Sequence, residues 1–504
     1  MPSRPIARIA VATSLIVQAA ILSVPAGAQT GSQSSKLTAQ LDSVMNALMA
    51  MDLSPGAGIV VVRDTQIVYM KGFGYADVAA KRAFTPETEF YIASTTKSFT
   101  GLAAALLDRK GTLKLKAPLH QYLPALKLKS PLDADSITIR SLLTHTHGIG
   151  NGPMAMRLAY SGEYNGNADL IKYLEMHEAA KTGREFAYGN IGYNVAALAM
   201  DAATKKSWKD VLQSELFTPL GMKHTGSYVS KFARNDLATP YQATLDGWVA
   251  RPYGKVDANM QSAGGLITTL RDMGIWLEAH TNNGKLDSKQ VLPASVFVEA
   301  HSNLAPFNRK GPLGAQIGYG LGWNIQIMGN DTVLAHGGGF PGFSTHMSFV
   351  PSRKIGVAIF ANNDGLGSGL AEIGAVLVYQ ALTDGAMKPP IPNEAIPQLM
   401  AQQREGMMND LKRRAARPQN LPFPLEAYAG VYENSAMGKL RIEVANGKLE
   451  ANFGAAWSAI EVFDNTKNQL RIALFGNGEV VNVEMKDGKA VALSFGGSEF
   501  KRVN

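Results

Sequence analysis

The order of apolar and polar residues predicts that the chain begins with a helix followed by a sheet. Apolar positions recur at helical intervals from Leu37 to Met51, which predicts the first helix. The β-branched runs Ala57–Arg63 and Gln66–Met70 follow, with only Asp64-Thr65 between them. Two such runs joined by a two-residue turn predict a β-hairpin.

The middle of the chain, from about residue 100 to 315, has a helical pattern interrupted by proline and glycine. We interpret it as a large, mostly α insertion. Strand patterns return after it, and the short turns between them predict an antiparallel meander covered by a helix at Gly367–Thr383. The predicted strands are Gly322–Ile327, Thr332–His336, Ser344–Val350 and Ile355–Asn362.

The last part of the chain changes pattern twice. Residues 386–420 begin as a proline-rich linker and continue as a polar helix. Residues 421–504 form short alternating runs separated by turns such as Asn446-Gly447 and Asp487-Gly488. The pattern predicts a small, independent β-barrel-like domain at 421–504.

Residues 1–28 have the pattern of a secretory signal peptide. Arg4 and Arg8 precede an apolar run, and the small residues Ala26-Gly27-Ala28 fit a cleavage site. The alternative is an uncleaved N-terminal anchor, for which the run is short. We therefore expect cleavage after about Ala28, no stable membrane span afterwards, and a periplasmic or secreted protein.

Composition narrows the choice of chemistry. The 504 residues contain no cysteine, which excludes disulfides, thiol catalysis and thiolate metal sites. The formal charge of +8 is a mild excess for this length, so nucleic acid is not an expected partner. The densest basic run, Lys412-Arg413-Arg414, is interpreted as a solvated helix face.

The stretch Ser94-Thr95-Thr96-Lys97 precedes an Ala- and Leu-rich run, so we expect Ser94 at a helix N-terminus. One helical turn later, Lys97 lies on the same face. A serine beside an amine is the arrangement of a nucleophile and its base, provided that desolvation lowers the pKa of Lys97. A serine three residues before a lysine is also common, and Ser498 with Lys501 repeats the pattern.

Two further stretches carry polar groups that such a site needs. Tyr188 can relay a proton to a leaving group, and Asn190 can bind both Lys97 and a substrate amide. His336-Gly337-Gly338-Gly339 ends a predicted strand, where the glycines let a substrate approach the backbone. The simpler interpretations are a packing tyrosine and a satisfied strand-end histidine. Similar patterns recur at Tyr432-Glu433-Asn434 and His224-Thr225-Gly226.

Taken in order, Ser94-x-x-Lys97, Tyr188-x-Asn190 and His336-x-Gly338 resemble the motifs of the serine β-lactamase and penicillin-binding-protein superfamily. The branch that the chain resembles most contains class C β-lactamases, DD-carboxypeptidases, D-aminopeptidases and related esterases. Other stretches similar to that family are Ile137–Thr146, Pro219–Met222, Ser262–Leu266 and Tyr319–Trp323.

The resemblance covers residues 35–385 and implies an α/β fold, in which helices and a large, mostly α insertion flank an antiparallel β-sheet. It implies catalysis by Ser94, Lys97 and Tyr188. Substrate would be bound by Asn190, His336 and Gly338, and the backbone N–H groups of Ser94 and Gly339 would form the oxyanion hole. The terminal segment Tyr428–Tyr432 resembles a lipocalin-like β domain, whose expected role is to stabilise the fold.

His336 stands where β-lactamases usually carry lysine, which implies a weaker grip on a substrate carboxylate. We expect that grip to depend on pH, with a limb in the activity profile at about pH 6 to 7. The only metal alternative is His145-Thr146-His147, which offers two ligands without a third. We expect no metal and no cofactor.

The sequence therefore predicts an exported serine hydrolase that forms an acyl-enzyme on Ser94. The expected substrate is a small peptide, amide or ester, cleaved by an aminopeptidase-like or carboxypeptidase-like activity. A carboxylesterase or β-lactamase of the same superfamily is the first alternative. A noncatalytic envelope protein that binds peptidoglycan peptides is the second, and the oligomeric state is not indicated.

Overall fold

The computed structural model describes residues 26–150, 152–311, 314–388, 391–476 and 478–503. The predicted signal peptide at 1–28 lies outside the described residues except for its last three, which begin helix α1 (Ala26–Ala50). The predicted first helix is thus the second half of a longer one. A helix nucleated by an apolar stretch extends readily into flanking residues of adequate propensity.

A nine-stranded sheet forms the centre of the body, in the order β10-β11-β12-β13-β14-β15-β1-β2-β3. Every neighbouring pair is antiparallel. The first hairpin of the chain therefore joins the edge of the later meander, as the predicted fold class requires. The strands are β1 (Gly56–Arg63), β2 (Gln66–Asp77), β3 (Arg82–Ala83), β10 (Ala305–Gly311), β11 (Gly314–Tyr319), β12 (Asn324–Met328), β13 (Asp331–Phe340), β14 (Phe343–Val350) and β15 (Ile355–Ala361).

One predicted boundary is wrong. The mostly α region was expected to continue to about residue 315, but β10 begins at Ala305 and β11 follows it in the sheet. β10 is the edge strand, and Asn308, Arg309 and Lys310 on it are exposed. Charged residues are typical of edge strands, and they removed the apolar alternation that would have marked this one.

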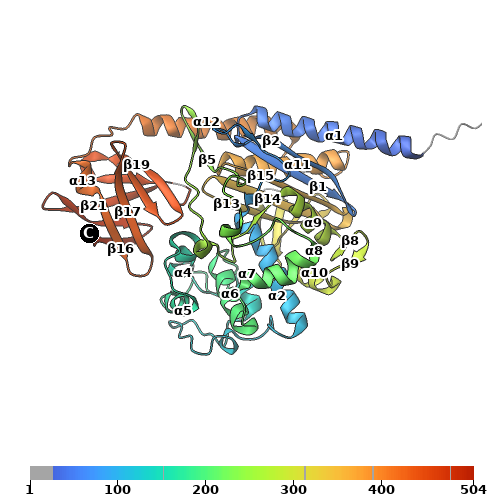
Figure 1. Cartoon of the computed structure of the whole chain (residues 1–504), viewed down its shortest axis with the longest axis horizontal. Coiled ribbons are helices and arrows are strands. Elements are labelled where there is room, and N and C mark those ends of the chain that lie inside the picture. Colours follow the sequence, from blue (N-terminus) through green and yellow to red (C-terminus); the bar gives the residue numbers. More distant parts are fainter. Residues whose placement is uncertain (1–25, 151, 312–313, 389–390, 477, 504) are drawn as a thin grey trace, which may run out of the picture.

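Helices cover both faces of the sheet (Figure 1). Strand β15 shows the alternation: Ile355, Val357 and Ile359 belong to the core under α1 and α11 (Leu366–Leu382). Ala358 and Phe360 belong to the opposite core, which includes α9 (Leu270–Thr281). Because successive side chains point to opposite faces, a strand buried on both sides reads as one apolar run.

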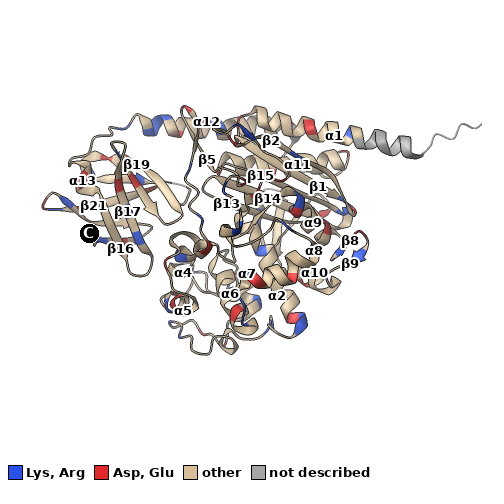
Figure 2. Ribbon diagram, in the orientation of Figure 1, with Lys and Arg blue, Asp and Glu red and all other residues tan. Residues whose placement is uncertain are grey.

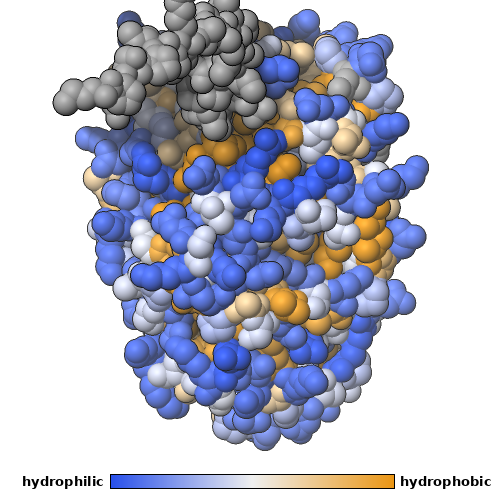
Figure 3. All heavy atoms as spheres, turned by 90° about the vertical axis from the view of Figure 1, so that its right-hand side faces the viewer, coloured by the Kyte–Doolittle hydropathy of each residue, from blue (hydrophilic) through white to orange (hydrophobic). Residues whose placement is uncertain are grey.

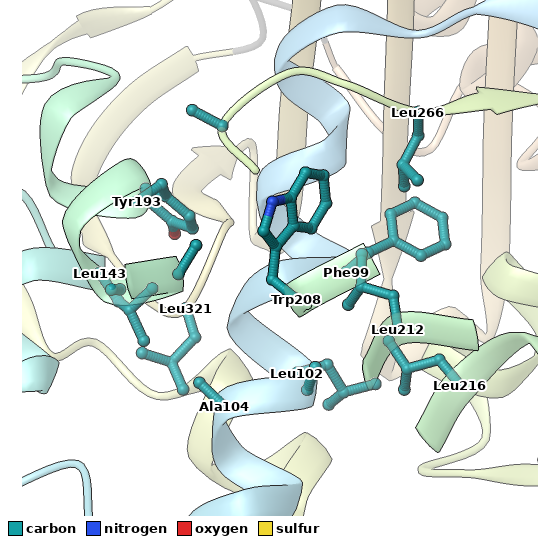
Figure 4. Packing of buried hydrophobic residues seen from close by; sticks show 14 of the residues in the cluster. Phe99, Leu102, Ala104, Leu143, Tyr193, Trp208, Leu212, Leu216, Leu266 and Leu321 are labelled. Carbon is teal, nitrogen blue, oxygen red and sulfur yellow. The ribbon is translucent and has the colours of Figure 1, made fainter. Parts of the chain in front are cut away.

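Helix α2 (Thr96–Lys110) runs through the middle of the second core. All of its residues from Thr96 to Leu107 are buried, and Phe99 stacks on Trp276 with ring centroids 3.8 Å apart. Figure 4 shows Phe99 and Leu102 surrounded by side chains from other elements, among them Trp208 and Leu216. Packing on all sides therefore fixes the position of the helix N-terminus, where the predicted nucleophile lies.

The remaining elements of the body are short, except for α6. The helices are α3 (Ile139–Leu143), α4 (Pro153–Met156), α5 (Asn167–Glu175), α6 (Ile191–Thr204), α7 (Trp208–Leu212), α8 (Thr218–Leu220) and α10 (Ala294–His301). The small strands are β4 (Phe90–Tyr91), β5 (Tyr241–Thr244), β6 (Gly247–Ala250), β7 (Ile267–Thr268), β8 (Lys285–Leu286) and β9 (Lys289–Gln290).

The C-terminal part is a closed eight-stranded barrel with its own apolar core, beside the body (Figure 1). After the short α13 (Leu425–Tyr428), its strands are β16 (Gly430–Asn434), β17 (Gly438–Ala445), β18 (Lys448–Phe453), β19 (Ala456–Asp464), β20 (Gln469–Ile472), β21 (Glu479–Lys486), β22 (Lys489–Phe495) and β23 (Ser498–Arg502). The predicted all-β domain is confirmed.

Helix α12 (Ile396–Ala415) leads from the body to the barrel (Figure 1). Its last turn contains the basic run 412–414, and Arg414 donates to the Glu461 carboxylate of β19, with Nε 2.8 Å from Oε2. The interpretation of this run as a wholly solvated face is therefore wrong for Arg414, which ties the helix to the barrel.

Charged residues of both signs are distributed over body and barrel (Figure 2). On the side of the body away from the barrel, hydrophobic residues lie in small patches among hydrophilic ones (Figure 3). Within the described ranges, no helix combines the length and the hydropathy that crossing a membrane requires.

Candidate active site

A strained turn presents Ser94 at the start of α2. Strand β4 pairs with β7 and leads into the 3₁₀ turn Ala93–Thr95 (η1), and the α-helix proper begins at Thr96. Ala93 has φ +46°, in the left-handed region, which costs a residue with a Cβ about 1–2 kcal/mol. Ser94 is partly exposed while its neighbours on both sides are buried. The turn thus exposes the Ser94 hydroxyl in a segment that is otherwise buried.

Lys97 is fully buried, and its ammonium nitrogen contacts three oxygens. Nζ lies 3.0 Å from Ser94 Oγ, 2.9 Å from Asn190 Oδ1 and 2.8 Å from the carbonyl of Ala263. Burial holds the pKa of Lys97 well below its usual value, and no carboxylate among the described residues counteracts it. Burial therefore shifts Lys97 towards the neutral amine, the form that can act as a base.

The partners of Lys97 decide what a neutral amine does there. The side-chain oxygen of Asn190 and the carbonyl of Ala263 only accept hydrogen bonds, so they take the two N–H groups of the amine. In the neutral form, the remaining lone pair can point at Ser94 Oγ, 3.0 Å away, and Ser94 is the one of the three partners with a proton to donate. The arrangement can remove the proton of Ser94 without a prior rearrangement.

Tyr188 lies beside both Ser94 and Lys97. Its hydroxyl hydrogen-bonds to the Ser94 side chain, and its ring lies 4.9 Å from Lys97 Nζ. The residue is 43% exposed, yet the protein atoms crowded around it raise the pKa of Tyr188 to about 12. The hydroxyl is therefore protonated at neutral pH and can act as an acid towards a leaving group.

His145 holds the Tyr188 loop, a role that the sequence did not indicate. Its carbonyl accepts from Ala187 N at 2.9 Å, its Nδ1 accepts from Gly189 N at 3.4 Å, and its ring lies 4.7 Å from the Tyr188 ring. The stretch containing His145 was noted only for its resemblance to the family and as half of a metal pair. No local pattern links it to residues more than forty positions later.

His336 is buried, at 2% exposure, and does not present a charge. Its Nδ1 lies 2.7 Å from the carbonyl of Gly337 and must donate to it, so its Nε2 accepts from the Tyr319 hydroxyl at 3.0 Å. Burial lowers the pKa of His336 to about 3. The expected limb at pH 6 to 7 is therefore wrong for this residue, because neighbours distant in sequence enclose it.

The glycines after His336 let β13 approach the nucleophile turn. A Cβ on Gly338 would lie 2.2 Å from the carbonyl oxygen of Ile92, so only glycine fits there. A Cβ on Gly339 would meet no atom within 4 Å, and this residue is exposed. Strand β13 contacts η1, so the two predicted oxyanion donors, Ser94 and Gly339, lie on touching elements. Their role in binding an oxyanion stays a prediction.

The repeated motifs lie elsewhere. Ser498 begins β23 of the barrel, and the hydroxyl of Tyr432 donates to the carbonyl of Tyr428 in the barrel core. His224 faces Glu89, with Nδ1 3.9 Å from Oε1. The structure thus brings together Ser94, Lys97, Tyr188 and Asn190, and it places His336 behind Tyr188, with ring centroids 5.9 Å apart.

Comparison with known proteins points in the same direction as the geometry. The model of the Beta-lactamase family matches residues 41–380. Protein flp of Staphylococcus aureus (strain MW2) is 28% identical over 329 residues, which cover 64% of this chain. The match spans 62% of the length of that curated relative.

Two solved structures share the fold. The octameric penicillin-binding protein homologue from Pyrococcus abyssi has a TM-score of 0.58 at 22% identity, covering 92% of this chain and 99% of its own. The D-amino acid amidase from Ochrobactrum anthropi SV3 has a TM-score of 0.59 at 22% identity, covering 69% and 99%. At these identities the likeness shows the fold alone.

Proposed function

Because this chain belongs to the beta-lactamase family, we propose that it is a serine hydrolase that cleaves amide or ester bonds through an acyl-enzyme on Ser94. The observation that carries the proposal is the environment of Lys97. A buried amine that meets no carboxylate among the described residues, has its pKa lowered by burial and lies 3.0 Å from Ser94 Oγ is suited to act as the base.

The first half of the reaction follows from these contacts. Lys97 takes the proton of Ser94 while Oγ forms a bond to the substrate carbonyl carbon, and the C=O electron pair moves onto oxygen. Backbone N–H groups at Ser94 and Gly339 would stabilise that oxyanion, and each donor would lower the activation free energy by about 3 kcal/mol. When the tetrahedral intermediate collapses, the leaving nitrogen or oxygen receives the Tyr188 proton, and Lys97 reprotonates Tyr188.

Water completes the cycle by attacking the acyl carbonyl. Its proton passes to the neutral base, the bond to Ser94 Oγ breaks, and Ser94 regains a proton as the acid product leaves. Asn190 can serve both halves of the reaction. Its side-chain oxygen accepts from Lys97, and this fixes the orientation of its amide nitrogen, which can donate to a substrate carbonyl.

The charge state of the site favours substrates that carry no free carboxylate next to the bond that is cleaved. His336 is uncharged and enclosed, and Lys97 is buried with all its contacts satisfied. Neither can hold a free carboxylate, which both a carboxypeptidase and a β-lactamase must bind. We therefore place an amidase or aminopeptidase-like activity on small peptides and amides first, and a carboxylesterase second.

The test uses two serines that each precede a lysine by three residues. Wild-type protein and Ser498→Ala should react with a fluorophosphonate probe, with the adduct on the peptide containing Ser94. Ser94→Ala should neither react nor turn over substrate. Labelling that survives in Ser94→Ala would contradict the assignment.

A substrate panel on the same preparation separates the alternatives. D- and L-amino acid amides and dipeptide amides should be cleaved faster than peptides ending in D-alanyl-D-alanine carboxylate or a chromogenic cephalosporin. Faster cleavage of short acyl esters than of any amide would favour the esterase. Failure of every activated ester to acylate the wild type would favour the noncatalytic peptide-binding protein.

We also propose that the protein is exported, on the pattern of residues 1–28. Protein recovered from the periplasm or medium should begin near Gln29. A mature N-terminus at Met1 would contradict this.

A further inference from the structure

A second buried lysine lies close to the site but has no part in the proposed chemistry. Lys255 is 2% exposed, and Nζ donates to the carbonyl of Ala159 at 2.6 Å and to that of Asn259 at 3.3 Å. Nζ also lies 4.0 Å from the centre of the Phe340 ring, close enough for a desolvated cation–π contact. Rings of Tyr91 and Tyr160 enclose it at 5.1 and 5.9 Å.

These contacts join segments that are distant in sequence. Phe340 ends β13 and directly follows Gly339, the predicted oxyanion donor. Ala159 belongs to the π-helical turn η3 (Arg157–Ser161), and Asn259 ends the 3₁₀ turn η6 (Asp257–Asn259). The ammonium therefore holds the end of the glycine strand against two loops of the helical region.

The same loops receive the C-terminal barrel. Ala455 of the barrel donates its N–H to the carbonyl of Tyr160 at 2.9 Å, and Phe475 lies against the Tyr160 ring, with centroids 4.3 Å apart. A Cβ on Gly254, next to Lys255, would lie 2.5 Å from the Ala455 backbone. The barrel is therefore in direct contact with the segment that carries Lys255.

We propose that Lys255 is a positioning residue, which holds the end of β13 and the Gly339 backbone N–H in place and ties them to the barrel. The proposal rests on the function proposed above, in which the Gly339 N–H stabilises the oxyanion. It assigns to the barrel an effect on turnover in addition to the stabilising role expected of it.

The contact depends on the proton of Lys255. Burial lowers the pKa of Lys255 to about 7, so the cation is lost from neutral pH upward. The rings around it do not titrate there: burial raises the pKa of Tyr160 to about 12 and that of Tyr91 well above 10. Lys209, which donates to the Asp257 carbonyl of η6, does titrate in this range, because burial lowers its pKa to about 8, so the loss of the decline in Lys255→Met is what assigns the decline to Lys255. Arg157 donates to barrel carbonyls, and Asp257 accepts from Ser230. Without its charge the amine loses the attraction to the Phe340 face.

The experiment measures kcat and KM on an activated ester from pH 6 to 9 in full-length protein. Lys255→Met should lower kcat about tenfold with KM within twofold, and its kcat should show no decline above pH 7. Wild-type kcat should fall above pH 7 towards the level of the variant. Lys231→Met is the matched control, because Lys231 is exposed and also lies over a ring, that of Tyr228 at 4.7 Å.

Phe340→Leu gives an independent readout, since it removes the ring and leaves both carbonyl contacts of Lys255. It should abolish the decline above pH 7 in the same way, and it decides the matter if Lys255→Met does not fold. A kcat and pH profile equal to wild type in either folded variant would overturn the proposal, even if the melting temperature falls. If the wild type itself is inactive and unlabelled, the proposed function fails instead.

Discussion

Lys97 and Lys255 are both buried, and neither has a carboxylate partner in the part of the chain that the structure describes, yet their surroundings suit them to different tasks. Each donates to two acceptors, and each lies near aromatic rings. They differ in the third group that each side-chain nitrogen contacts. Lys97 meets the hydroxyl of Ser94, whereas Lys255 meets the face of Phe340.

The difference shows that burial alone does not make a lysine a base. Desolvation lowers the pKa of both amines, but a base also needs a donor in line with its lone pair. An aromatic face attracts a cation and offers no acidic proton, so Lys255 acts through its charge. Lys97 acts as a base, and only its uncharged form can do so.

The strongest way to break this comparison is Lys97→Arg. A guanidinium cannot deprotonate in a protein, so the variant keeps the charge and loses the base. We expect kcat/KM to fall by about 10³-fold or more, at the upper end of general-base effects. Lys255→Arg, which keeps its cation, should lose far less. Retention of over a tenth of wild-type activity in Lys97→Arg would contradict the base role.

Tyr188→Phe should have the next largest effect, because it removes the proton donor beside Ser94. We expect about a 10²-fold loss of kcat with an amide, whose leaving nitrogen needs a proton. With a p-nitrophenyl ester, whose leaving group departs as an anion, the loss should be several-fold. Equal losses on both substrates would show that Tyr188 only shapes the site.

Much of this site was predictable because its parts are short motifs. Ser94 and Lys97 are one helical turn apart, and Tyr188 and Asn190 flank a glycine at the start of an apolar helix. The carbonyl of Ala263 was not predictable as a partner of Lys97, since any residue type supplies a carbonyl. The charge state of His336 was also hidden, because it depends on enclosure by distant residues such as Tyr319.

In the sheet, too, local sequence patterns predicted some features and long-range contacts hid others. Runs of mostly apolar residues predicted β13, β14 and β15, which are largely buried, but the exposed polar residues of β10 concealed the edge strand. Lys255 carries no sequence signal, since its contacts come from three separate segments. Local patterns thus identified the elements, and long-range packing determined what each polar group does.

A second pair of buried bases, two histidines, extends the comparison to stability and should have no effect on turnover. His280 Nδ1 lies 2.8 Å from His301 Nε2 in an aromatic core, and burial lowers the pKa of His301 to about 3 and holds that of His280 well below its usual value. Both stay neutral in the folded protein but bind protons below pH 6.5 when unfolded. Stability is therefore fully present above pH 6.5 and is lost as pH falls towards 3.

Each such histidine contributes a slope of about 1.4 kcal/mol per pH unit across that window. The free energy of unfolding in urea should fall between pH 6.5 and 5 in the wild type and less steeply in His301→Gln. An identical slope in the variant would mean that His301 is protonated in the folded state.

The central claim is that burial lowers the pKa of Lys97 so that its amine can act as the base, and the pKa of its side chain tests this most directly. Nuclear magnetic resonance of ¹³C-labelled lysine side chains, with Lys97→Arg to assign the signal, would follow the Cε shift against pH. A Lys97 midpoint well below the 10.5 of an ordinary lysine is the predicted result. A Lys97 signal that stays in its charged position up to about pH 10 would contradict the account.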